Sequence, residues 1–128
     1  MTALLVAAFL IAHGLLHPVV WTAPRQQPDG TPAPFVPGHS WALSVSGVPA
    51  AAAGAVALAL AWYTAVVYVL AGAGVLAGAG WWPAAALVAA STGLLLKAVW
   101  FDPWLGFGVL LDVGVVVAVA CTWPASVY

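Results

Sequence analysis

The chain has 128 residues, of which 66% are hydrophobic and only 4% are charged, and its formal net charge is −1. Because soluble domains carry roughly 25% charged residues, this composition excludes a soluble fold and predicts an integral membrane protein with a single small domain. The few basic residues provide no patch for nucleic acid, and the single cysteine, Cys121, excludes an internal disulfide.

The first predicted span covers residues 3–22. It lacks a basic N-terminal region, and its apolar run exceeds the roughly 7–15 residues of a signal-peptide core, so we interpret it as a membrane helix. His13 and His17 are four residues apart, which places both rings on one face of that helix. An imidazole in hydrocarbon requires a hydrogen-bond partner, a water-filled cavity or a metal ion. Both histidines are therefore candidate site residues.

A proline-rich segment follows the first span. Its prolines are Pro24, Pro28, Pro32, Pro34 and Pro37. Proline cannot continue a helix and favours extended backbone, and so long a connection is unusual in a small domain. This length suggests a lid or a docking loop, but we favour the simpler interpretation, an ordered interfacial loop without chemistry. His39 and Trp41, near the end of this segment, are candidate ligand-binding residues.

Three further apolar runs predict spans at residues 48–78, 82–100 and 103–122. The first of them is longer than the roughly 20 residues that cross a bilayer, so either the helix is tilted or its first turns lie in the interface. Gly74 and Gly78 have the spacing of small residues at a helix–helix contact, and we interpret Tyr68 as a packing residue. The predicted fold is all-α: an integral membrane four-helix bundle with a proline-rich first loop and both termini on one side.

The depth of each polar side chain follows from the helical rise of about 1.5 Å per residue. His13 and Asp112 each lie roughly 13 Å below the face that carries the first and third loops, and Thr92 falls in the same layer. His17 and Lys97 lie one layer nearer that face. These residues line one cavity if they point inward, although we expect the flexible Lys97 side chain to extend to the interface instead.

Asp112 is the strongest candidate for a functional residue, because an intramembrane carboxylate costs at least ~2.5–3.5 kcal/mol on the insertion scale and is usually paired. His13, His17 and Asp112 form the predicted catalytic set, since a His–Asp pair in a dry cavity can relay protons near neutral pH. A structural hydrogen bond between the first and last spans is the simpler alternative. The predicted ligand-binding residues are Trp21, His39, Trp41, Thr92, Lys97 and Trp100.

We therefore predict a membrane protein that binds a lipid or quinone-like ligand beside the His/Asp pair, with proton transfer as the associated chemistry. One alternative is an accessory subunit or assembly factor that docks onto a larger membrane complex or forms a homo-oligomer. A second is a metal site, because two histidines and one carboxylate leave an open coordination position, although no Cys or Glu joins them. The sequence has no nucleophile, phosphate-loop or dinucleotide motif, so the reaction and the cofactor stay open.

The orientation is predicted from two basic residues. Arg25 and Lys97 both belong to the face that carries the first and third loops, and the positive-inside rule places that face in the cytoplasm. We expect a multi-pass protein of the cell membrane whose partners are membrane lipids rather than nucleic acid.

Several motifs give the chain a resemblance to known membrane proteins. The first span contains His13-Gly14-Leu15-x-His17-x-x-x-Trp21, and the last begins with Asp102-Pro103-Trp104 and contains Asp112. This pattern resembles small four-helix bacterial membrane proteins of the DoxX-like kind and a related group that carries His-Gly-Leu-x-His in its first helix. The resemblance implies a four-span fold and an expected link to membrane-associated redox complexes.

Overall fold

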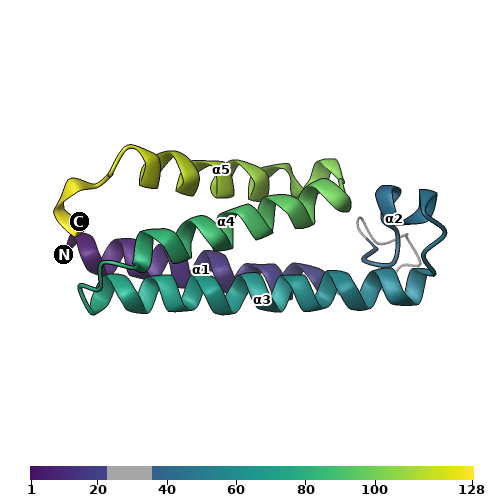
Figure 1. The fold of residues 1–128 in the computed structure, drawn as a ribbon, viewed down its shortest axis with the longest axis horizontal. Helices are drawn as coiled ribbons and strands as arrows, with labels where there is room; N and C mark the ends of the chain where they lie inside the picture. Colours follow the sequence, from purple (N-terminus) through teal and green to yellow (C-terminus); the bar gives the residue numbers. More distant parts are fainter. Residues whose placement is uncertain (23–35) are drawn as a thin grey trace, which may run out of the picture.

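The computed structural model describes residues 1–22 and 36–128, and within those ranges it contains helices and no strand. Four of the described helical segments are long and apolar enough to cross a membrane (Figure 1). They are α1 (Thr2–Trp21), α3 (Ala50–Leu76), α4 (Trp82–Val99) and the span Pro103–Ala120, which comprises the short 3-10 helix η1 (Pro103–Leu105) and α5 (Gly106–Ala120). The predicted all-α, four-helix membrane fold is confirmed.

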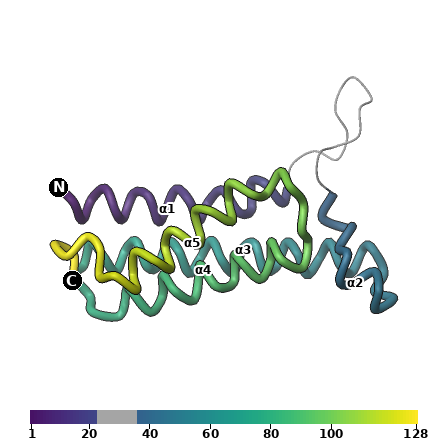
Figure 2. The backbone as a smooth tube through the Cα atoms, turned by 90° about the horizontal axis from the view of Figure 1, so that it is seen from above, coloured from purple at the N-terminus to yellow at the C-terminus, as the bar shows by residue number. Residues whose placement is uncertain are grey.

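Two short helices complete the described chain. α2 (Trp41–Val45) lies at one end of the bundle, and the 3-10 helix η2 (Ala125–Val127) lies at the other end, where both termini are found (Figure 2). The helix limits differ from the predicted spans by a few residues at most. The largest differences are at α3, which begins at Ala50 behind Pro49 and ends at Leu76.

Small residues set the distance between α1 and α3. A Cβ atom on Gly14 would lie 2.5 Å from Tyr68 Cβ, and one on Gly72 would lie 2.7 Å from Ile11 Cγ1 and 3.0 Å from the carbonyl oxygen of Ala7. Without a hydrophobic driving force between helices in lipid, such close approach of backbones is what holds them together. The α1–α3 contact therefore depends on these glycines.

The predicted contact of Gly74 and Gly78 is correct at Gly74 alone. A Cβ on Gly74 would lie 2.9 Å from Trp82 Cβ, so this glycine admits the first residue of α4. Gly78 has a φ of 61° and open space around its Cβ position. It lies just beyond the end of α3, where a positive φ favours glycine.

The end of the proline-rich segment is fixed to the C-terminal end of α4. Ser40 Oγ donates to the Val99 carbonyl at 2.7 Å, and Trp41 Nε1 donates to the Ala98 carbonyl at 2.7 Å. In return, Trp100 Nε1 donates to the Pro37 carbonyl at 2.7 Å. Both interpretations of the loop, as an interfacial loop and as a lid or docking loop, concern mainly residues 23–35, which lie outside the described residues.

The four spans do not pack equally. The extensive contacts join α1 with α3, α3 with α4, and α4 with α5. Only 17% of the last span is buried within the described protein, against 33–39% of the other three, and the buried residues of α5 are Asp112 and Val115. The edge between α1 and α5 is consequently open, and two cavities lie along it.

Candidate functional site

One buried carboxylate joins all four spans. Asp112 on α5 is fully buried and accepts hydrogen bonds at Oδ1 from His13 Nε2 of α1 and from the Tyr68 hydroxyl of α3, each at 2.7 Å. Its Oδ2 accepts from the Lys97 ammonium of α4 at 2.7 Å. Burying a charge is tolerated when it is paired and hydrogen-bonded, and Asp112 meets both conditions.

His17 completes the cluster through Lys97. The Lys97 ammonium lies 2.9 Å from His17 Nε2 and 3.4 Å from the Gly93 carbonyl oxygen. His17 Nδ1 lies 3.1 Å from the carbonyl oxygen of His13. Because a carbonyl only accepts, the proton of His17 is on Nδ1, and Nε2 accepts from Lys97. The three ammonium protons of Lys97 thus have three acceptors.

The hydrogen bonds assign donors and acceptors within the cluster. An ionised Asp112 accepts only, so His13 Nε2 donates to it, and His17 Nδ1 donates to the carbonyl oxygen of His13. The negative charge of Asp112 and the positive charge of Lys97 lie 2.7 Å apart and offset each other.

One atom of the cluster stays unsatisfied. His13 Nδ1 is buried and has no hydrogen-bond partner among the described residues. An unsatisfied buried polar atom costs about 1–3 kcal/mol. The ring lies beside Phe9, stacked at a centroid distance of 5.8 Å, and beside Tyr68, edge-on at 5.0 Å. His13 Nδ1 is therefore the ring nitrogen of the cluster that is left for a further hydrogen bond.

Two glycines make room for the charged side chains. A Cβ on Gly93 would lie 2.5 Å from Asp112 Oδ2 and 2.9 Å from His17 Nε2, and one on Gly108 would lie 2.6 Å from Lys97 Cε. Sequence reasoning missed both. Their spacing offered a signal, since Gly93 precedes Lys97 by four residues and Gly108 precedes Asp112 by four, which places each glycine on the same helix face as the charge.

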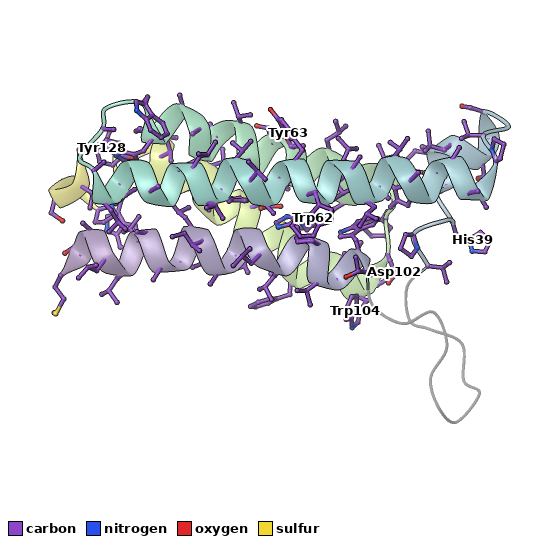
Figure 3. All side chains as sticks on the ribbon, turned by 90° about the horizontal axis from the view of Figure 1, so that it is seen from below. His39, Trp62, Tyr63, Asp102, Trp104 and Tyr128 are labelled. Carbon is purple, nitrogen blue, oxygen red and sulfur yellow. The ribbon has the colours of Figure 1, made fainter. Side chains whose placement is uncertain are left out.

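A cavity of about 310 Å³ adjoins the cluster at the edge between α1 and α5. We call it the head cavity. His13, His17 and Lys97 form its polar side. Its apolar side is formed by Leu16, Val20, Trp21, Trp104, Leu105, Phe107 and Leu111, with Gly108. Figure 3 shows Trp104, one of these lining residues, beside the C-terminal end of α1.

The structure brings the predicted catalytic set together, with His13, His17 and Asp112 in one cluster. The expected extension of Lys97 to the interface is wrong. Its side chain is 6% exposed and points into the protein, because the carboxylate of Asp112 offers a stronger partner than water at the interface. The interpretation of Tyr68 as a packing residue is incomplete, since its hydroxyl is one of the donors to Asp112.

The predicted ligand-binding residues divide into two groups. Trp21 and Lys97 line the head cavity, whereas the other four lie elsewhere. Trp100 is buried against Trp21 and bonded to Pro37, and Thr92 Oγ1 donates to the Val88 carbonyl of its own helix at 2.8 Å. The depth estimate gave Thr92 the correct layer but could not give the direction in which it points.

His39 and Trp41 also lie away from the cluster. His39 is exposed, and Figure 3 shows it at the end of the molecule beyond the C-terminus of α1. Trp41 is 62% exposed, and its indole is bonded to the end of α4. Both residues follow a segment whose path through space cannot be derived from helical periodicity.

The metal alternative can be tested against the same geometry. Donor atoms of His13, His17 and Asp112 lie within 4.8 Å of one another, and three protein ligands are the usual set of a catalytic zinc site. The Lys97 ammonium, however, already lies 2.7 Å from Asp112 Oδ2 and 2.9 Å from His17 Nε2. A metal ion would have to displace this built-in cation, so the donor set fits a metal poorly.

A scan against protein-family models found no match, and searches of the curated proteins and of the solved structures found none either.

Proposed function

We propose that this membrane protein binds a hydrophobic molecule with a hydroxyl-bearing head, such as a quinol or a hydroxylated lipid, in the head cavity, and that His13 exchanges a proton with that head. The observation that carries the proposal is that His13 lines the cavity and has a ring nitrogen, Nδ1, with no hydrogen-bond partner among the described residues. A hydroxyl donating to this atom would remove the cost of leaving it unsatisfied.

The head cavity has the properties of a small-molecule site. Its volume of about 310 Å³ falls at the lower end of the roughly 300–1,000 Å³ usual for ligand pockets, which are mostly apolar with a few placed polar groups. In the adjoining cluster, the charges of Asp112 and Lys97 offset each other. A neutral head is therefore favoured over a phosphate or a carboxylate.

The cluster is also arranged for proton transfer. When His13 Nδ1 accepts a proton, the ring becomes an imidazolium whose Nε2–H already points at Asp112. Tyr68 and Lys97 hold that carboxylate in place, so the new positive charge forms beside a fixed negative one. Such preorganised charge is the usual way in which a carboxylate supports a histidine base.

The proposal is tested by calorimetric titration of the detergent-solubilised protein with decylubiquinol, with decylubiquinone as the matched ligand that lacks hydroxyl donors. The quinol is expected to bind more tightly than the quinone, by roughly fivefold for one hydrogen bond. A second titration compares 1-monoolein with its O-methylated form, which tells whether a lipid hydroxyl is preferred to a quinol.

His13→Gln is the decisive variant, because its amide can still donate to Asp112 but has no basic ring nitrogen. The preference for hydroxylated ligands should disappear in this variant and persist in His39→Gln, whose residue is exposed and far from the cavity. Equal binding of each ligand pair to the unmodified protein, or an unchanged preference in His13→Gln, would refute the proposal.

We propose in addition that the chain is related to the DoxX-like proteins and resides in the cell membrane. The support for this is the motif around His13, His17 and Asp112 together with the four-helix membrane fold. The expected link to membrane redox complexes would then provide a source of quinol.

A second candidate function, docking onto a larger membrane complex or a second copy, is favoured by one observation. Only 17% of the last span is buried within the described protein, against 33–39% of the other three, and its exposed face includes Phe107 and Leu110. Leu110→Cys, in a background where Cys121 is replaced by serine, should form a disulfide-linked dimer if two copies meet here. A monomer that co-purifies with no other membrane protein would contradict docking through this face.

A further inference from the structure

A second and larger cavity lies along the same open edge. Its volume is about 510 Å³, and it extends between the N-terminal half of α1 and the C-terminal half of α5. We call it the chain cavity. Its lining is apolar apart from Thr2 and the Trp82 and Trp123 indoles, and includes Leu5, Phe9, Gly114, Val115 and Ala118. The function proposed above does not use it.

The two cavities adjoin each other beside the cluster. Leu111 lines both of them, and Phe9, which lines the chain cavity, stacks on the His13 ring with an interplanar angle of 4°. The His13–Asp112 hydrogen bond joins α1 to α5 at this same level. A ligand whose head lies in the head cavity would therefore find the chain cavity next to it, past Leu111.

The chain cavity has the size and lining of a site for a hydrocarbon chain. It follows α1 from Thr2 to Leu10, a length of about 12 Å at the helical rise. Its volume of about 510 Å³ lies within the roughly 300–1,000 Å³ usual for ligand pockets. An alkyl or isoprenoid chain extended along α1 would bury its apolar surface against this lining.

We propose that the chain cavity binds the apolar tail of the ligand whose head occupies the head cavity, which makes the ligand an amphiphile with one long tail. The inference rests on the function proposed above. The tail runs along α1 toward the end of the bundle that carries both termini, with the head at His13 in the middle of the membrane. The ligand enters sideways from the lipid, because the edge between α1 and α5 is open along both cavities.

The test uses two ligands with the same hydroquinone head, one with a decyl tail and one with a methyl group in its place. Gly114→Leu places a side chain at the chain cavity, which Gly114 lines, and its Cβ meets nothing within 4 Å. Gly106→Leu is the matched control, since Gly106 is in the same helix, has the same open surroundings and lines neither cavity.

Gly114→Leu should weaken binding of the decyl ligand by roughly tenfold, as expected for overfilling a packed site, and should leave the methyl ligand unaffected. Gly106→Leu should change neither affinity. An unchanged decyl affinity in Gly114→Leu, or equal weakening of both ligands, would overturn the tail site. The proposed function would still stand if the methyl ligand kept its dependence on His13, and it would fall if that dependence were absent.

A labelling experiment makes the test independent of any variant. A decyl hydroquinone with a diazirine at the end of its tail should label residues of the chain cavity, such as Leu5 or Val115, in the intact protein. Labelling confined to the exposed face of α3, for example at Val66, would show that the tail lies in bulk detergent and would overturn the inference.

Discussion

Both halves of the membrane domain have a cluster of buried apolar side chains, but they differ in what else joins their helices. In the half near α2, Asp112 accepts hydrogen bonds from three other spans, so polar contacts join all four helices. In the half near the termini, Gly72 brings α1 against α3, and α5 leaves a wide apolar cavity against α1. Within one membrane bundle, a polar cluster can thus fix the relative positions of the helices at one depth, while α1 and α5 stay apart at another depth.

The largest effect is expected from Asp112→Leu. It leaves the Lys97 ammonium buried without a counter-charge, and breaking a buried pair in this way costs roughly 3–5 kcal/mol. Asp112→Asn should be milder, since the amide can still accept from Tyr68. Reversible unfolding in mixed micelles measures both. If Lys97→Met in the Asp112→Leu background failed to recover any stability, the Lys97–Asp112 pairing would be contradicted.

An intermediate effect is expected from Gly72→Ala in the apolar half. The new methyl group would lie 3.0 Å from the Ala7 carbonyl oxygen and 2.7 Å from Ile11, so α1 must shift, at about 1–3 kcal/mol for overpacking. Gly114→Ala is the matched control, because its methyl group enters open space. Equal stabilities of the two variants in the same unfolding assay would mean that close α1–α3 packing does not stabilise this half.

The smallest effect is expected from Thr92→Val. The Thr92 hydroxyl bonds only its own helix in the described structure, and a substitution away from the cluster should change stability by less than about 0.5 kcal/mol. Binding of decylubiquinol should also stay unchanged. A clear loss of either would place Thr92 at the site after all and would extend the polar half across the outer face of α4.

Much of the polar half could be predicted from the sequence. The spacing of His13 and His17 gave their shared face, and the helical rise gave the common depth of His13 and Asp112, which the structure joins at 2.7 Å. These two predictions depend on distances along straight helices. Helical geometry fixes such distances before the helices are packed.

The direction in which each side chain points around the axis of its helix could not be predicted from the sequence. Thr92 and Gly93 are neighbours, yet only Gly93 faces the cluster. Lys97 has a stem long enough to reach either the interface or the interior, and the choice depends on where Asp112 lies. The cavities depend in the same way on how α5 packs against the other helices. Because the buried residues of α5 are Asp112 and Val115 alone, its sequence carries little pattern from which that packing could be predicted.

We infer that the cluster is neutral overall and holds its two histidines in opposite tautomers, with His13 Nδ1 unprotonated. Nitrogen-15 NMR of histidine-labelled protein distinguishes these states, because the chain has three histidines and His39→Gln removes the signals of the exposed one. We expect His13 to be protonated at Nε2 and His17 at Nδ1, with decylubiquinol shifting the His13 Nδ1 signal. The same tautomer in both rings, or a stable imidazolium in the ligand-free protein, would contradict this arrangement.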